Sequence, residues 1–476
     1  MRILFAVSEA APFIKTGGLA DVAGSLPAAL AKEGHEVQVV LPLYEGISEE
    51  WRRRMRFVTH FDVQLAWRNQ YCGVLELERD GVAYLFLDNE YYFKRPNLYG
   101  HYDDGERFAF FSRAVLYLPE KLGFSPDIIH CNDWQTALIP VYLEAEHDRP
   151  GLEKTKSVFT IHNIEYQGRY GAGILGDVFG LDSSYLSEEK LGYYGDVNLM
   201  KGAIFAADAV TTVSPTYAQE LHYAFYAHGL EGVVSHNAGK LTGILNGIDT
   251  KLYDPQNEKR LPKPFSAKDL SGKKECKKAL QRAVGLAVRE DVPIIACVSR
   301  LVKHKGFDQV AMAIHDIMSM DVQMVVLGTG EWNYEETFRQ TQRQYPGRFS
   351  AQMKYSAELS EVIYAGADLF LMPSVSEPCG LSQMIAMRYG TVPVVRETGG
   401  LKDSVVPYNR FDGTGTGFSF RNIDWRDMMR ALEQAAALWK DDKEMWKTLQ
   451  VRGMTADLSW DRSAARYTEV YESLAR

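Results

Sequence analysis

Short apolar runs rich in β-branched residues recur along this chain and alternate with stretches of helical periodicity. In the first half the runs are Ile3–Val7, Val37–Leu41, Ala83–Leu87, Asp127–His130, Ser157–Ile161 and Ala209–Val213. In the second half they are Pro293–Ser299, Gln323–Gly328, Asp368–Met372 and Val392–Val395. Runs this short and apolar are typical of parallel strands buried on both faces. Their alternation with helices predicts an α/β fold with doubly wound sheets.

The alternation restarts near residue 290, and 476 residues exceed what one hydrophobic core usually serves, so we expect two domains. Residues 250–278 are rich in Lys and Pro and poor in apolar residues, which indicates a linker or a surface excursion. Residues from about Met454 to Arg476 are expected to be helical. Two doubly wound domains side by side would create a cleft lined by the carboxyl ends of their strands, where ligands bind in such sheets.

Composition excludes several classes of function. The formal net charge of −9 gives no general attraction to nucleic acid or anionic lipid, so the positive partners of an anionic ligand must be local. The five cysteines form no CxxC pair, which predicts reduced thiols rather than disulfides or a zinc site. No leader-like segment precedes the first run and no long apolar stretch follows, so we expect a cytoplasmic protein without a membrane span.

The sequence KTGGLADV begins at Lys15, where the first strand should pass into the first helix. Gly17 and Gly18 allow a ligand to approach the backbone, and a helix N-terminus beside a lysine suits a phosphate. A tight turn with a solvated lysine is an equally good interpretation. Neither GxxxxGK[ST] nor GxGxxG occurs here, which disfavours a P-loop nucleotidase and a dinucleotide-dependent oxidoreductase.

Two loops in the second half carry comparable features. In SRLVKHKGFD, Arg300 and Lys305 could converge on a diphosphate, although such loops are more often simply solvated. In SEPCGLSQ, Glu377 could accept hydrogen bonds from sugar hydroxyls or be an ordinary loop acid. The helix start at Leu381 and Ser382 could take phosphate oxygens. Cys379 has no local histidine partner, and we expect a packed thiol rather than a nucleophile.

Further candidates follow other expected strands in HCNDWQTA, TIHNIEYQG and LNGID. Alone, His162 would be a satisfied loop histidine and Asn246 part of a turn. No DxD metal motif is present, so lysines, arginine and helix dipoles would have to neutralise a leaving diphosphate. The aromatic stretch 89–104 could seat an acceptor or form a packed loop.

Taken together and in this order, KTGGLADV, NGID, RLxxxKG, SEPCGLSQMIAMRYG and TGGLKDSV resemble bacterial glycogen synthases and plant starch synthases over essentially the whole chain. The resemblance implies the GT-B architecture of two Rossmann-like domains around a deep cleft. The expected limits are residues 1–245 and 246–455, with residues 456–476 as a helix that packs back on the first domain. The same resemblance implies transfer of glucose from ADP-glucose to the non-reducing end of an α-1,4-glucan, with retention of configuration and without metal or other cofactor.

The resemblance also implies two groups of site residues. In the first domain they are Lys15, Gly17, Gly18, Asp21, Asp133, His162, Asn163 and Asn246. In the second domain they are Arg300, Lys305, Tyr355, Glu377, Cys379, Gly380, Leu381 and Ser382. Of these, the residues expected to act in catalysis are Asp21, Asp133, His162, Lys305 and Glu377, and the others, with Lys305, are expected to bind the donor. Arg300 and Lys305 are expected on the diphosphate, Glu377 on the glucose and Tyr355 on the adenine.

The sequence departs from many GT-B enzymes at Ile385, where a second glutamate would stand; the ADP-glucose branch also lacks that acid. Retention could proceed through a carboxylate nucleophile or by same-face displacement, and we favour displacement. The alternatives are a UDP-glucose-dependent GT-B transferase with another acceptor, a non-catalytic sugar-binding protein and an oxidoreductase. We expect no nucleic-acid or membrane partner, while the sequence leaves the oligomeric state open.

Overall fold

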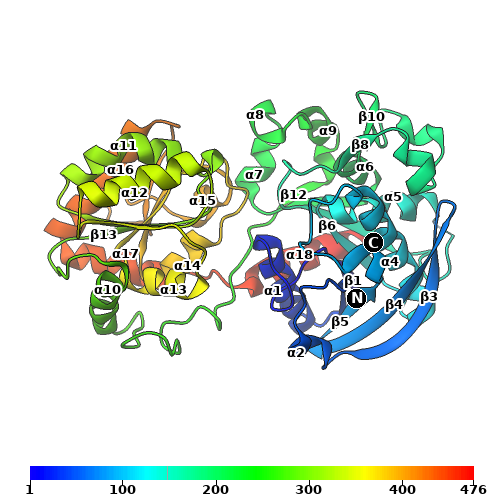
Figure 1. Cartoon of the computed structure of the whole chain (residues 1–476), viewed down its shortest axis with the longest axis horizontal. Coiled ribbons are helices and arrows are strands. Elements are labelled where there is room, and N and C mark those ends of the chain that lie inside the picture. The colour runs from blue at the N-terminus through cyan, green and yellow to red at the C-terminus, as the bar shows by residue number, and fades with distance from the viewer. Residues whose placement is uncertain (147, 476) are drawn as a thin grey trace. The chain divides into compact units, whose positions relative to one another are not determined.

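A computed structural model describes residues 1–146 and 148–475 and divides the chain into two compact units (Figure 1). Unit 1 consists of Met1–Gly247 and Trp460–Arg476, and unit 2 is Ile248–Ser459. Each unit is an α/β structure with its own sheet, so the predicted fold class of doubly wound domains is confirmed.

The main sheet of unit 1 has the strand order β12-β11-β7-β6-β1-β2-β5-β4-β3. Its strands are β1 (Arg2–Ala6), β2 (Glu36–Pro42), β3 (Arg56–Leu65), β4 (Arg68–Arg79), β5 (Val82–Asp88), β6 (Ile128–Asn132), β7 (Lys156–Ile161), β11 (Ala209–Thr212) and β12 (Leu241–Gly243). Seven neighbouring strands are parallel, whereas β4 and β3 are added in antiparallel register. A small second sheet contains β8 (Arg169–Gly171), β9 (Gly192–Tyr193) and β10 (Asp196–Asn198).

The helices of unit 1 are α1 (Gly18–Lys32), α2 (Glu49–Arg52), α3 (Glu90–Phe93), α4 (Asp104–Leu122), α5 (Leu138–Ala145), α6 (Leu199–Ala206), α7 (Pro215–Glu220), α8 (Ala224–Ala227), α9 (Glu231–His236) and α18 (Trp460–Leu474). Helix α18 packs against α1 although more than 400 residues separate them. Inside the unit, Tyr471 of α18 is fully buried and its hydroxyl lies 2.7 Å from Nδ1 of His130 on β6. The end of the chain therefore completes the core of unit 1.

The sheet of unit 2 has the order β15-β14-β13-β16-β17-β18, all parallel. Its strands are β13 (Ile294–Val298), β14 (Gln323–Leu327), β15 (Phe349–Gln352), β16 (Leu369–Met372), β17 (Val392–Arg396) and β18 (Phe418–Phe420). Its helices are α10 (Ser271–Val284), α11 (Phe307–Ser319), α12 (Trp332–Gln344), α13 (Ala357–Gly366), α14 (Ser382–Arg388), α15 (Gly399–Ser404), α16 (Trp425–Asp441) and α17 (Lys443–Thr455). Helices α11, α12 and α16 cover one face and α10, α13 and α14 the other (Figure 1). Because strand order reverses between β13 and β16, this unit has a topological switch point there.

All ten apolar runs singled out in the sequence lie in parallel strands of the two main sheets. The antiparallel ribbon β3–β4 was not predicted, because its alternating pattern is half-exposed rather than continuously apolar. The helical prediction from about Met454 also needs adjustment, since α17 ends at Thr455 and α18 begins at Trp460.

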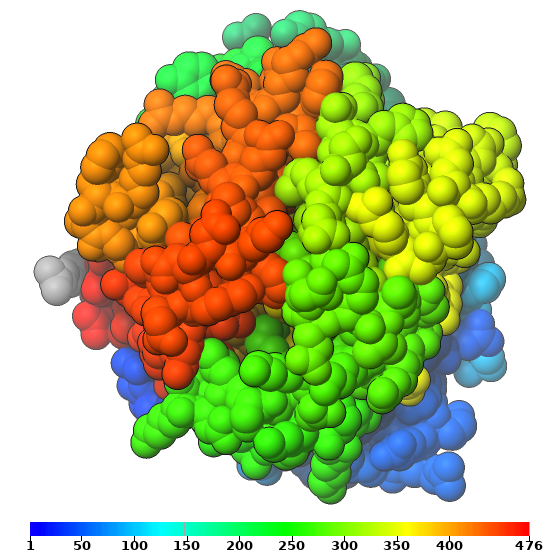
Figure 2. Space-filling view, turned by 90° about the vertical axis from the view of Figure 1, so that its left-hand side faces the viewer, coloured from blue at the N-terminus to red at the C-terminus, as the bar shows by residue number. Residues whose placement is uncertain are grey.

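The prediction of a linker or surface excursion over 250–278 is wrong for its last part, because α10 begins at Ser271 and packs against α13. Two of its lysines are buried: Lys277 pairs with Asp368 at 2.8 Å, and Trp439 of α16 donates to the same carboxylate at 3.0 Å. Figure 2 shows this face of unit 2, with α16 and α17 in orange-red beside the green segment that contains α10. A lysine-rich helix can lie in a core when protein oxygens replace water around each ammonium.

Lys273 is the clearest case, because its ammonium donates to Ala365 O at 3.0 Å, Tyr389 O at 2.9 Å and Thr391 Oγ1 at 2.8 Å. Burial lowers its pKa to about 8. Lys273→Met should lower the free energy of unfolding by about 2–4 kcal/mol, since it leaves three buried oxygens without their donor. Lys274→Met, on the exposed face of the same helix, should change it by less than about 0.5 kcal/mol in the same urea titration. Equal effects of the two substitutions would contradict this assignment.

Candidate active site

The site residues predicted in unit 1 all follow strands at the carboxyl edge of its parallel sheet. The KTGG loop comes after β1, Asp133 after β6, His162 and Asn163 after β7, and Asn246 after β12. This is the edge at which open α/β sheets bind ligands.

Glu9 holds the KTGG loop in place, and sequence reasoning did not identify it. Its side chain is only 3% exposed and accepts hydrogen bonds from the backbone N–H and hydroxyl of Thr16, the latter at 2.9 Å. Gly17 N–H donates to the same carboxylate at 3.4 Å. Burial raises the pKa of Glu9, and these donors partly offset that cost. The sequence signal for this role was one acidic residue, Glu9, within the otherwise apolar run ILFAVSEAAPF.

Lys15 reaches Asp21 on the first turn of α1. The ammonium lies 2.6 and 2.7 Å from the two carboxylate oxygens of Asp21. Burial raises the pKa of the Asp21 carboxyl even with the lysine beside it. The structure thus brings these two predicted residues together as an ion pair, with Gly17 and Gly18 between them in the chain.

Asp133 supports the neighbouring loop from a strained backbone. Its φ of 58° and ψ of −179° are unusual for a residue with a side chain, and such strain is concentrated at functional sites. Its Oδ1 accepts N–H bonds from His162 at 2.8 Å and Asn163 at 3.4 Å. Burial, with a smaller contribution from the nearby Glu9, raises its pKa to about 7 despite these hydrogen bonds, so this carboxyl titrates near neutral pH.

His162 is a partly buried, neutral imidazole, and its ring is oriented by Asn132, which sequence reasoning did not identify. Burial lowers its pKa to about 3. Nε2 lies 2.8 Å from Oδ1 of Asn132, whose amide nitrogen donates to Ala6 O at 3.0 Å. Because that amide orientation leaves Oδ1 as an acceptor, His162 donates through Nε2, and Nδ1 is its acceptor.

Asn246 is buried, and no partner for its Oδ1 is found among the residues that the structure describes. A buried amide oxygen without a donor is costly. Asn246 is therefore suited to bind a polar ligand.

Unit 2 places Lys305 beside Glu377 at its topological switch point. A side chain at Gly306 would begin 2.0 Å from Pro373 O, so only glycine lets the loop after β13 approach the loop after β16 this closely. The Lys305 ammonium then donates to both oxygens of Glu377 at 2.8 and 2.7 Å. Ser374 adds a third hydrogen bond to that carboxylate at 2.9 Å.

The loop after β17 supports the SEPCG segment from the other side. A Cβ at Gly399 would lie 1.9 Å from Glu377 O, so the TGG sequence is needed for close packing. Cys379 is buried, as expected for a packed thiol, and Gly380 has a φ of 71° just before Leu381 and Ser382. All five cysteines are buried thiols, and none forms a disulfide within the described residues.

Three other positions complete the description of unit 2. Ile385, where many GT-B enzymes carry an acid, is 5% exposed and packs in the core. Arg300 is exposed at the end of β13, and among the described residues its guanidinium has no recorded partner. Tyr355 is 83% exposed after β15, two strands away from β13, and the structure does not bring it into contact with Glu377.

The aromatic stretch 89–104 is largely a packed loop in unit 1. The buried Arg107 donates to Tyr92 O and Leu98 O, and the Tyr99 hydroxyl lies 2.7 Å from that of Ser8. Tyr91 and Tyr102 remain exposed.

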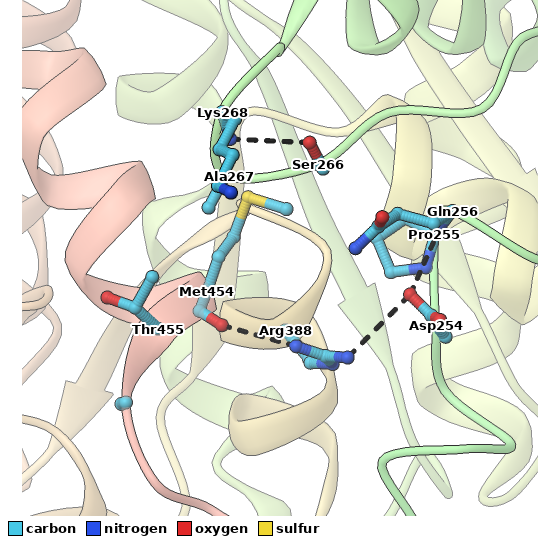
Figure 3. Close-up of a pocket in the computed structure, with 10 residues that line it drawn as sticks. Asp254, Pro255, Gln256, Ser266, Ala267, Lys268, Arg388, Met454 and Thr455 are labelled. Carbon is cyan, nitrogen blue, oxygen red and sulfur yellow. Dashed lines mark hydrogen bonds and ion pairs between the residues drawn. The ribbon is translucent and has the colours of Figure 1, made fainter.

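A pocket of about 440 Å³ in unit 2 lies at the other end of α14 (Figure 3) and contains none of the predicted site residues. Arg388 crosses it and is already engaged by Asp254, Tyr253 O and Met454 O.

Within residues 1–146 and 148–475, no cluster of three His, Cys, Asp or Glu could hold a metal ion. No described helix is both long and apolar enough to cross a membrane.

Comparisons with known proteins agree with this arrangement. A family model of the starch synthase catalytic domain matches residues 2–236, and a model of group 1 glycosyl transferases matches residues 282–449. Glycogen synthase of Geobacillus thermodenitrificans is 49% identical over 100% of this chain and 98% of its own length. That of Clostridium novyi is 46% identical over 100% and 99%.

Solved structures give the same result. The catalytic domain of starch synthase IV from Arabidopsis thaliana, bound to ADP and acarbose, has a TM-score of 0.92 and 37% identity, covering 100% of this chain and 99% of that one. Sucrose-phosphate synthase from Thermosynechococcus elongatus has a TM-score of 0.62 and 18% identity over 99% and 98%, which shows the shared GT-B fold alone. The chain belongs to the glycogen synthase and starch synthase family of glycosyltransferases.

Proposed function

We propose that this chain transfers glucose from ADP-glucose to the non-reducing end of an α-1,4-glucan, with retention of configuration and release of ADP. The glycogen synthases among its relatives support the reaction, and the starch synthase structure bound to ADP supports the nucleotide. The observation that carries the proposal is the pairing of Lys305 with Glu377 at the switch point of unit 2, on a loop after β13 that also carries the exposed Arg300. Five buried thiols outside any disulfide support a cytoplasmic location.

In the proposed roles, Arg300 and Lys305 neutralise the diphosphate, and Glu377 accepts hydrogen bonds from the glucose hydroxyls. Gly380, Leu381, Ser382 and Cys379 would form the surface beneath the sugar, and Tyr355 would stack on the adenine. When the donor binds, Lys305 would move from Glu377 to a phosphate. The Glu377 carboxylate would then be able to bind the sugar hydroxyls.

The residues of unit 1 are proposed to act on the same donor. Lys15, presented by the loop that Glu9 holds, would supply a second cation for the phosphates when it leaves Asp21. His162 would accept a hydrogen bond from a sugar hydroxyl through Nδ1. Asn246 would donate or accept a hydrogen bond to the same ligand, and Asp133 would orient Asn163 through its backbone N–H.

The step that we favour is a same-face displacement. The bond from the anomeric carbon to the phosphate oxygen breaks, the acceptor 4-hydroxyl forms the new glycosidic bond, and its proton passes to the departing phosphate. A covalent route would need a carboxylate nucleophile, and the acids among the predicted site residues are Asp21, Asp133 and Glu377. All three accept hydrogen bonds: Asp21 from Lys15, Asp133 from backbone N–H groups, and Glu377 from Lys305 and Ser374. These contacts favour positioning and electrostatic stabilisation over covalent catalysis. The cations available here support a reaction without a metal.

The donor and acceptor can be tested by measuring ADP release from ADP-glucose with glycogen, beside UDP-glucose, each with and without EDTA. We expect glycogen-dependent release that EDTA does not change and that exceeds the rate with UDP-glucose at least about tenfold. Faster turnover of UDP-glucose, or release independent of glycogen, would assign the chain a different reaction on the same fold.

The leaving-group cations can be tested by Lys305→Ala and Lys15→Ala. Each should lower kcat about 10- to 100-fold, because a charge-assisted contact is worth roughly 1.5–3 kcal/mol. Lys303→Ala is the matched control, since Lys303 is exposed in the same loop as Lys305 and should leave turnover within about twofold. Normal rates in both test variants would contradict the proposal that these two lysines stabilise the leaving diphosphate.

Asp133 should give stability a distinct pH dependence. Its folded-state pKa of about 7 lies above the ordinary value of 3.8, so the folded state retains a proton that the unfolded state has lost between these values. Its contribution to stability therefore falls as pH rises from about 4 to 7 and is constant above that range. Asp133→Asn should be more stable relative to the parent at pH 8 than at pH 5, measured as urea midpoints. Asp461→Asn, at an exposed position, should show no such difference.

A further inference from the structure

The β3–β4 ribbon forms the edge of the unit 1 sheet and has two different faces (Figure 1). Its inner face carries the buried Phe61, which stacks on Tyr117 of α4 with ring centroids 5.7 Å apart. Its outer face carries exposed side chains, among them Phe57, His60 and Tyr71. The proposed reaction uses none of these three rings.

A β-bulge brings Phe57 onto the outer face. Strict alternation would place Phe57 on the same side as the buried Phe61. The register of β3 on β4 shifts between Phe57 and Thr59, which reverses that alternation. The Phe57 ring is 55% exposed, and its centroid lies 6.3 Å from that of His60.

A glycine lets the next ring lie flat. Gly73 stands opposite His60 in the ribbon, and a Cβ there would meet Tyr71 Oη at 2.7 Å and Cε1 at 3.3 Å. The Tyr71 ring therefore covers Gly73, nearly parallel to the His60 ring, at an interplanar angle of 26° and a centroid distance of 5.8 Å. The β-bulge and the glycine together place Phe57, His60 and Tyr71 in one row of aromatic rings, which we call the ring platform.

Polar groups border the ring platform. Asp62 pairs with Tyr71 across the ribbon, Asn69 stands opposite Gln64, and the Asn69 amide donates to Asp62 at 3.3 Å. All three polar side chains are exposed. Flat apolar rings flanked by carboxylate and amide groups match a pyranose, which presents C–H groups on its faces and hydroxyls around its rim.

The ring platform also lies at the ligand-binding edge of its sheet. Because β4 is antiparallel to β5, the beginning of β4 is at the carboxyl end of β5, where Gly73 pairs with Asp88. Asn89 in the loop after β5 donates to Tyr71 O at 2.8 Å. The KTGG loop and Asp133 follow strands at this same edge.

We propose that Phe57, His60 and Tyr71 form a binding site for an α-glucan chain, separate from the residues that bind the donor. The identity of the glucan rests on the proposed function. The site would hold a polymeric acceptor by stacking, while short acceptors would not need it.

The test compares Phe57→Ala, Tyr71→Ala and the double variant with the parent chain. In native gels containing glycogen, the double variant should lose most of its retardation, and its KM for glycogen should rise about tenfold, the effect of no longer burying one ring face. The kcat, the KM for ADP-glucose and the rate with maltotriose should be unchanged. Tyr71→Trp should restore retardation, and Tyr194→Ala, which removes a ring that is 91% exposed elsewhere in unit 1, should have no effect.

The outcomes separate this site from the proposed reaction. Parent activity on maltotriose tests the reaction without involving the ring platform. A double variant with native circular dichroism and unchanged glycogen retardation would overturn the glucan site and leave the reaction intact. Loss of self-association in sedimentation, with glycogen binding unchanged, would also overturn it and make this face a contact between copies of the chain.

Discussion

Close backbone packing between neighbouring loops sets the geometry of the charged groups in unit 2. Gly306 against Pro373 O and Gly399 against Glu377 O bring three loops, after β13, β16 and β17, into direct contact. The hydrogen bond from the Lys305 ammonium to the Glu377 carboxylate depends on this contact between the loops. The glycines in the KG and TGG sequences therefore determine where charge is placed, although they carry no charge themselves.

The charges follow one rule in both units. Each lysine proposed for the phosphates is paired with a carboxylate in the structure, Lys15 with Asp21 and Lys305 with Glu377. A held lysine is already ordered, so less side-chain entropy is lost when a phosphate replaces the carboxylate. Each exchange also leaves a carboxylate that can receive a donor such as a hydroxyl.

The sequence predicted the parallel strands and most of the charged loops well, because buried strands and Gly-rich loops leave local patterns. It failed where a tertiary partner decides the outcome. The lysines of α10 look solvated until Ala365 O, Tyr389 O and Asp368 surround them. Glu9 and Asn132 looked like parts of strand ends, and their roles depend on loops that the fold brings to them. The β3–β4 ribbon was missed because one of its faces is exposed, so its residues do not form a continuous apolar run.

The anchoring of α18 has a consequence for how the chain is made. The sheet of unit 1 precedes unit 2 in the chain, but unit 1 lacks Tyr471 and the rest of α18 until the segment after unit 2 is synthesised. Unit 2 is continuous from Ile248 to Ser459 and has all its strands before α18 exists. During translation, the unit whose synthesis starts first is thus the last to have a complete core, and the partly built sheet of unit 1 must wait with the site of α18 unfilled while unit 2 can already fold.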